Sequence, residues 1–215
     1  MIKFTGVSKA YRGGKLALQG LNFHLNKGSL TYIVGHSGAG KSTLLKLIMA
    51  MEKANGGKIE FNGYDITRLA RYEIPFLRRQ IGMVHQNYCL LSDYNIRDNV
   101  ALPLIISGMP PKFAIKEADR ALDLVGLTQS RQLFPNEVSG GEQQRVDIAR
   151  AIVHKPSLLL ADEPTGNLDK ALAKEIFQLF HRCNQTGMTV LIATHDTDLV
   201  YGYNHILRLK QGHLE

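Results

Sequence analysis

The segment from Gly35 to Thr43 constrains the fold of this chain most. It reads Gly-His-Ser-Gly-Ala-Gly-Lys-Ser-Thr and fits the pattern G-x-x-x-x-G-K-[ST] of a phosphate-binding loop. Residues 30–34 form a short apolar run that reads as a buried strand, and residues 41–51 carry helix formers. A chance glycine turn is the alternative, but the strand before it and the helix after it are the context that a phosphate loop requires. The predicted phosphate-binding residues are Gly35, His36, Ser37, Gly38, Ala39, Gly40, Lys41, Ser42 and Thr43.

Each residue type in this loop has a chemical reason. Glycines let backbone N–H groups turn toward phosphate oxygens, and the following helix presents its positive N-terminal end to the same anion. Lys41 can reach the β- and γ-phosphates of a nucleotide, and the Ser42 hydroxyl can ligate Mg²⁺. The sequence therefore predicts ATP and Mg²⁺ at this loop.

A second strand ends in a pair of acids. Residues 158–161 are apolar, and Asp162 and Glu163 follow them directly. Asp162 would hold Mg²⁺ through water, as a hard oxygen ligand. Glu163 would polarise the attacking water. The alternative is a strand that runs out into solvent with charged ends, and the phosphate loop upstream favours the catalytic interpretation.

The third motif precedes a predicted helix and reads Ser139-Gly140-Gly141-Glu142. Its serine and glycines would expose N–H groups at the helix N-terminus, which makes a second anion site. Ser139 and Glu142 also have the spacing of a capping box. A cap and an anion site use the same groups, so both interpretations can hold together.

The alternation of strands and helices predicts an α/β fold with a mostly parallel sheet. Residues 2–11 and 16–25 look like antiparallel strands, with a turn signal at Gly13-Gly14, and a further turn signal stands at Asn62-Gly63. From about residue 88 to 155 the pattern is helical only, so we expect a helical subdomain inserted into the sheet. The other predicted strands are 58–61, 189–194 and 206–209, and the other predicted helices are 95–107, 111–125, 140–154 and 170–184.

The order of the three motifs resembles the nucleotide-binding domain of ABC ATPases, and the resemblance covers the whole chain. It implies a P-loop NTPase fold with an antiparallel β edge, a single ABC ATPase domain over residues 1–215. It also implies a homodimer in which each ATP lies between the Lys41 loop of one copy and Ser139-Gly140-Gly141 of the other.

The resemblance also assigns residues that would be ambiguous alone. Gln86 would sense the γ-phosphate and ligate Mg²⁺, and Asp169, in Asn167-Leu168-Asp169, would belong to the loop that crosses between subunits. His195 would contact the γ-phosphate, and Tyr11 would stack on adenine. A lone tyrosine or histidine is more often structural, and their agreement in order and spacing supports these roles.

Within ABC ATPases the chain is most similar to the bacterial cell-division ATP-binding family, FtsE. This family pairs with an integral membrane subunit of the FtsX type and is thought to regulate septal cell-wall cleavage. The motif at residues 164–169 is shared with ATPases of lipoprotein-release and macrolide-type exporters, which remain the alternative. An ABC protein that acts on DNA or ribosomes and a P-loop kinase fit less well. The similarity to the division family rests on residues 1–4, 7–11, 35–41, 75–82 and 102–106.

Several positions depart from the family pattern. His85 stands where an aromatic residue usually precedes Gln86, and Asp147 replaces a small residue; its charge would face solvent or perturb its helix. Ala50, and the absence of a proline near Ala54, alter the loop after the first helix. None of these touches a catalytic atom.

The charge composition indicates which other classes of partner to expect. Lys and Arg number 26 against 19 Asp and Glu, a net charge of +7, without a long basic run. A solvated surface explains this excess best, an anionic inner-membrane surface comes second, and we expect no nucleic-acid partner. We find no apolar run of membrane-spanning length and no signal-like start, so we expect a cytoplasmic protein, peripheral on the inner membrane, with Cys89 and Cys183 reduced.

Overall fold

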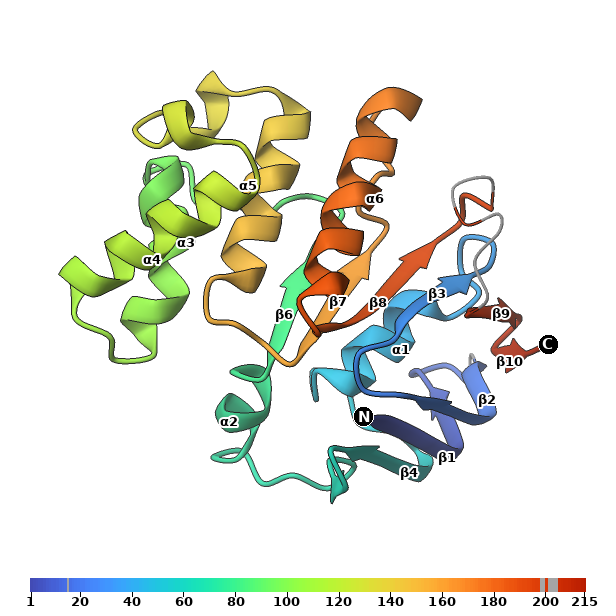
Figure 1. Ribbon diagram of the computed structural model, residues 1–215. Coiled ribbons are helices and arrows are strands. Elements are labelled where there is room, and N and C mark those ends of the chain that lie inside the picture. Colours follow the sequence, from blue (N-terminus) through green and yellow to red (C-terminus); the bar gives the residue numbers. More distant parts are fainter. Residues whose placement is uncertain (15, 198–199, 201–204) are drawn as a thin grey trace. The chain divides into compact units, whose positions relative to one another are not determined.

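The computed structural model describes residues 1–14, 16–197, 200 and 205–215 (Figure 1). These form two compact units: the first comprises Met1–Arg78 and Cys183–Glu215, and the second comprises Arg79–Arg182. Each unit contains strands and helices, and each carries part of the predicted site.

The first unit contains the antiparallel sheet that the sequence predicts. Its strand order is β2-β1-β4-β5. The side chains of Ile2 and Phe4 are buried while Lys3 is exposed, which is the alternation expected of a sheet with one buried face. At the turn between β4 and β5, Asn62 and Gly63 both have positive φ, as a type I′ hairpin turn requires. The strands are β1 (Ile2–Ala10), β2 (Leu16–Leu25), β4 (Gly56–Phe61) and β5 (Tyr64–Asp65).

A second sheet in this unit is mostly parallel. The strand β3 (Leu30–Val34) pairs in parallel with β8 (Thr189–Thr194) and with β9 (Ile206–Lys210), and β10 (His213–Leu214) is antiparallel to β9. All six residues of β8 are buried, as expected for a parallel strand covered on both faces. The helix α1 (Lys41–Ile48) follows β3 after the glycine loop. The helix ends at Ile48, three residues before the predicted end at residue 51. Just after it, Ala50 adopts a left-handed conformation.

Two elements between residues 74 and 84 were not predicted from the sequence. One is the short helix α2 (Ile74–Arg78) in the first unit, and the other is the strand β6 (Ile81–Val84) in the second. Each is too short to show a clear hydrophobic period.

In the second unit, β6 pairs in parallel with β7 (Leu158–Asp162). The helices α3 (Ile96–Ile106), α4 (Pro111–Leu124) and α5 (Gly140–Ile152) pack on one another (Figure 1). The helix α6 (Lys170–Gln185) begins shortly after β7. These helices match the predicted ones to within a few residues. The core of α3, α4 and α5 includes Val100, Ala101, Ala114, Ala118, Leu122 and Val146, all fully buried.

Close packing in this unit brings α5 against β6. A Cβ atom on Gly82 would lie 2.2 Å from the carbonyl oxygen of Ala151, so only glycine permits this approach. None of the helices that the structure describes is long and apolar enough to cross a bilayer.

Candidate functional site

The phosphate loop lies in the first unit between β3 and α1. The ammonium group of Lys41 donates to the carbonyl oxygens of Gly35, at 2.6 Å, and His36, at 3.3 Å. Lys41 is only 5% exposed, whereas the side chain of Ser42 is exposed at the start of the helix. The loop thus holds a positive charge and a helix N-terminus together, and this combination suits phosphate.

Tyr11 lies beside this loop. Its hydroxyl is 3.3 Å from the Thr43 hydroxyl, within hydrogen-bond distance. The ammonium group of Lys9 lies 5.0 Å from the centre of the Tyr11 ring, and it also donates to Glu52 at 2.7 Å. The structure therefore brings Tyr11 to the predicted phosphate site and places beside its ring a buried lysine, Lys9, that the sequence did not single out.

The first unit also carries His195, directly after β8. Its side chain is exposed, and the backbone N–H of Asp196 donates to the Thr194 hydroxyl at 3.1 Å. Because β8 is the parallel neighbour of β3, His195 and the phosphate loop lie at the same edge of this sheet.

The acidic pair lies in the second unit. Asp162 is the last residue of β7, and Glu163 adopts a left-handed conformation with φ of 48°. The carbonyl oxygen of Glu163 accepts from the N–H of Gly166 at 3.1 Å and closes a turn. The chain then reaches Asp169, whose carboxylate accepts from two backbone N–H groups at the start of α6, at 2.9 and 3.0 Å. Asp169 therefore caps this helix.

The Ser-Gly-Gly motif forms the predicted capping box at the start of α5. The backbone N–H of Ser139 donates to Glu142 at 2.9 Å, and the N–H of Glu142 donates to the Ser139 hydroxyl at 3.3 Å. The backbone and hydroxyl bonds from Ser139 lower the pKa of Glu142. Gly140 and Gly141 thus begin a well-capped helix, and the anion site at its N-terminus stays a prediction.

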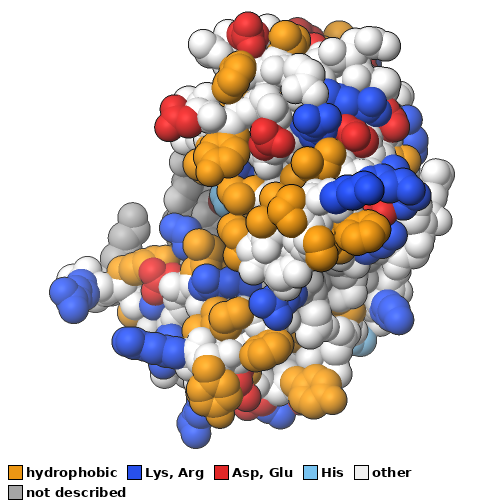
Figure 2. Space-filling model, turned by 90° about the vertical axis from the view of Figure 1, so that its left-hand side faces the viewer, with side chains coloured by type: hydrophobic (Ala, Val, Ile, Leu, Met, Phe, Trp, Pro, Cys, Tyr) orange, Lys and Arg blue, Asp and Glu red, His pale blue; other side chains and the backbone are white. Residues whose placement is uncertain are grey.

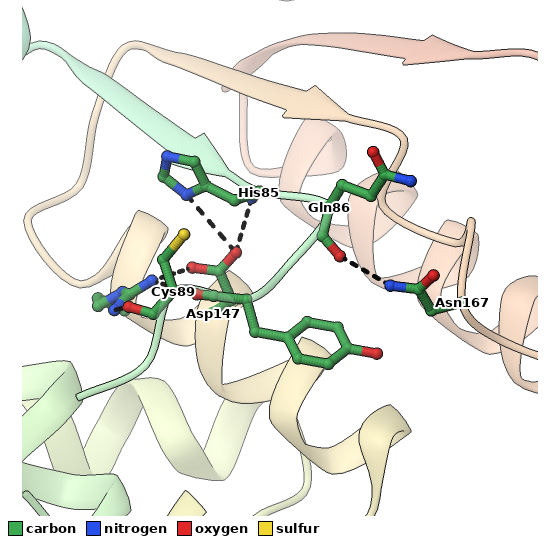
Figure 3. Close-up of polar contacts among 7 residues, drawn as sticks. His85, Gln86, Cys89, Asp147 and Asn167 are labelled. Atoms are coloured by element: carbon green, nitrogen blue, oxygen red, sulfur yellow. Dashed lines mark hydrogen bonds and ion pairs between the residues drawn. The ribbon is translucent and has the colours of Figure 1, made fainter. Parts of the chain in front are cut away.

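Gln86 follows β6 and contacts the segment after the acidic pair (Figure 3). Its carbonyl oxygen accepts from the side-chain amide of Asn167 at 3.2 Å. A Cβ atom on Gly166 would lie 3.3 Å from the Gln86 amide nitrogen, so the glutamine side chain lies over that glycine. The second unit therefore brings together Gln86 and the segment between Glu163 and Asp169.

The residue before Gln86, His85, is held by a side chain of α5. The carboxylate of Asp147 accepts from the backbone N–H of His85 at 2.7 Å and from Arg150 at 2.6 Å. The side chain of Asp147 is completely buried, which excludes the first of the two alternatives, that its charge faces solvent. Burial raises the pKa of Asp147, and the charge of Arg150 acts against that rise. The two departures from the family pattern, His85 and Asp147, are therefore neighbours.

Some residues that build this part of the chain gave no clear signal in the sequence. Arg150 donates to the carbonyl oxygens of Tyr88 and Cys89, at 2.5 and 2.6 Å. Asn99, which is fully buried, donates to three carbonyl oxygens at residues 91, 94 and 95, and accepts from the N–H of Leu91. In the sequence, the one signal was an asparagine close to the start of a predicted helix.

Comparison with known proteins decides the family. The model of the family described as ABC transporter matches residues 18–166, which is more than half of the chain. The chain belongs to the ABC transporter family. This cassette is an ATP-binding and ATP-hydrolysing protein with the ABC ATPase fold, as the resemblance implied.

Curated relatives match the cassette over its whole length. It is 67% identical to the cell division ATP-binding protein FtsE of Haemophilus influenzae over 216 residues, covering 100% of this chain and 99% of that protein. It is 55% identical to FtsE of Escherichia coli K12, covering 100% and 97%. The similarity to this branch that the sequence indicated is confirmed.

A solved structure shows the same fold. The ATP-binding cassette MJ0796, in a dimeric post-hydrolysis state bound to ADP and Pi, has a TM-score of 0.91 and 35% identity to this cassette. The match covers 100% of this chain and 97% of that one.

Proposed function

We propose that this cassette works as a homodimer that drives an integral membrane subunit of the FtsX type, at the cytoplasmic face of the inner membrane, in bacterial cell division. The observation that carries the proposal is the 67% identity to a cell division ATP-binding protein across the whole chain. In this role, opening and closing of the dimer would regulate septal cell-wall hydrolysis through the membrane subunit.

The proposed chemistry assigns a task to each predicted residue of one chain. Lys41 and the backbone of its loop bind the β- and γ-phosphates of ATP, and Tyr11 stacks on adenine. Glu163 orients the attacking water, and His195 contacts the γ-phosphate. Charge and positioning supply most of the rate in such a phosphoryl transfer.

The proposed Mg²⁺ ligands are the hydroxyl of Ser42, the amide oxygen of Gln86 and the carboxylate of Asp162. All three are hard oxygen donors, which is the chemistry that Mg²⁺ prefers, so the set fits the ion. When bound, Mg²⁺ neutralises negative charge on the phosphates.

The second copy completes each site in this proposal. Ser139, Gly140, Gly141 and Glu142, with Asp169, would face the nucleotide held by the Lys41 loop of the other copy. The capped start of α5 supports this, because a preformed helix N-terminus attracts anions. The solved dimeric cassettes of MJ0796 support the pairing itself.

For the domain organisation, we propose a single domain spanning residues 1–215, with residues from about 88 to 155 as a helical subdomain within it.

Surface composition supports a docking site for the membrane subunit on the segment 86–108. Val100 and Leu104 are buried and pack the helical core, whereas Leu91 is 43% exposed and Ile106 is 73% exposed. Figure 2 shows a face of the molecule on which apolar side chains lie among Lys and Arg. Exposed apolar groups rimmed by charge are typical of protein contacts.

Co-purification tests the proposal. The tagged cassette, expressed in its own host and extracted in mild detergent, should retain one integral membrane protein, identified by mass spectrometry. Depletion of either protein should then give the same defect in septation. An exporter subunit in place of an FtsX-type protein would favour the lipoprotein-release or macrolide-type alternative, and recovery without any membrane protein would contradict the proposal.

A further inference from the structure

The segment that carries Gln86 is built with unusual backbone geometry. Tyr88 and Cys89 are consecutive non-glycine residues with φ of 52° and 51°. In this conformation the Cβ atom lies too close to the following carbonyl oxygen, so each such residue carries a steric cost. Such conformations persist only where the surroundings fix them, and they gather at functional sites.

Two side chains of α5 provide that constraint. Asp147 accepts the backbone N–H of His85, the residue before Gln86, at 2.7 Å. Arg150 donates to the carbonyl oxygens of Tyr88 and Cys89, after Gln86, at 2.5 and 2.6 Å. Figure 3 shows His85 and Gln86 directed to opposite sides of the chain, with Asp147 on the His85 side.

The two side chains also hold each other. They stand three residues apart on one face of α5, and the Arg150 guanidinium donates to Asp147 at 2.6 Å. The side chain of Asp147 is 0% exposed and that of Arg150 is 17% exposed, so water competes little for these bonds. A pair held this firmly can fix a strained segment.

We propose that Asp147 and Arg150 are positioning residues for ATP hydrolysis. Their hydrogen bonds to the backbone on both sides of Gln86 fix the position of the Gln86 side-chain amide. Neither touches the nucleotide. This inference rests on the proposed role of Gln86. Because α5 also begins at the Ser-Gly-Gly motif, one helix would hold both that motif and the segment that carries Gln86.

The test measures the steady-state ATPase rate and thermal stability of the purified protein. Asp147→Ala removes the acceptor of the His85 N–H, and should lower kcat about 10- to 100-fold, since small misplacements of acting groups have effects of this size. The KM for ATP should change by less than about threefold, because the Lys41 loop is untouched. Asp147→Asn, which keeps one acceptor oxygen, should be intermediate, and it also serves if the alanine variant does not fold.

A double-mutant cycle separates positioning from a general structural effect. If Asp147 acts through Gln86, Asp147→Ala should cause no further loss of kcat in a Gln86→Ala background. Asp123→Ala is the matched control: it removes another carboxylate paired with an arginine, Arg131, in the same unit, and should leave kcat unchanged.

Two results would overturn the proposal. One is an unchanged kcat in Asp147→Ala, and the other is the same loss of kcat with and without Gln86. Both leave the ATPase function intact, whereas a wild-type protein that does not hydrolyse ATP would instead refute the function on which the inference rests.

Discussion

Two glycines of the phosphate loop allow the packing of that loop to be tested quantitatively. Gly38 has φ of 78° and Gly40 has φ of 110°, and neither value suits an alanine. They differ in their surroundings. A Cβ atom on Gly38 would meet nothing within 4 Å, whereas one on Gly40 would lie 2.4 Å from the Ala17 carbonyl oxygen and 2.7 Å from a methyl carbon of Leu18.

The two alanine substitutions should therefore lower the stability of the folded protein by different amounts. Gly38→Ala introduces backbone strain alone, about 1–2 kcal/mol. Gly40→Ala adds steric overlap with β2, which typically lowers stability by about a further 1–3 kcal/mol. The overlap is not easily relieved, because the nearest atom belongs to the backbone and cannot rotate away. At roughly 2–4 °C per kcal/mol for a protein of this size, Gly40→Ala should melt several degrees below Gly38→Ala.

The assay is thermal unfolding of both variants without nucleotide, so that ligand binding does not contribute to stability. Equal melting temperatures for the two variants would refute the close approach of the loop to Ala17.

Two further substitutions test the nucleotide site and the docking segment. Lys41→Ala should weaken ATP binding at least about 10-fold, because bonds to charged groups contribute about 1.5–3 kcal/mol each; unchanged affinity in titration calorimetry would show that the loop does not bind the phosphates. Leu91→Glu should release the cassette from membranes that contain its partner while solution ATPase activity and melting temperature stay near wild type. Leu124→Glu, at a leucine of α4 that is 67% exposed against 43% for Leu91, should not release it. Membrane co-sedimentation measures this, and retained binding of the Leu91 variant would argue against the docking segment.

Sequence alone predicted the parts of the fold that have a strong local signal. The phosphate loop, its flanking strand and helix, the capping box at Ser139 and the turn at Asn62-Gly63 all follow from short-range chemistry. The longer helices were found because their buried residues recur at helical spacing, as Ala114, Ala118 and Ala121 do in α4.

Interactions between distant residues could not be predicted in the same way. His85 and Asp147 are 62 positions apart, and each looked like an isolated departure until the structure joined them. A buried carboxylate needs a partner, but the sequence does not show which arginine supplies it. The Lys9 contact with Tyr11 was missed for the same reason, since a charged residue in a strand usually faces water.

In the proposed mechanism two copies enclose ATP and Glu163 promotes its hydrolysis. The decisive experiment is sedimentation velocity of Glu163→Gln, with and without ATP, together with its steady-state ATPase rate. We expect Glu163→Gln to hydrolyse ATP about 10²–10⁴-fold more slowly than wild type. It should form a dimer only when ATP is present, and the additional substitution Lys41→Ala should abolish this dimer. Near wild-type hydrolysis by a folded Glu163→Gln protein, or a variant that stays monomeric with saturating ATP, would contradict this mechanism.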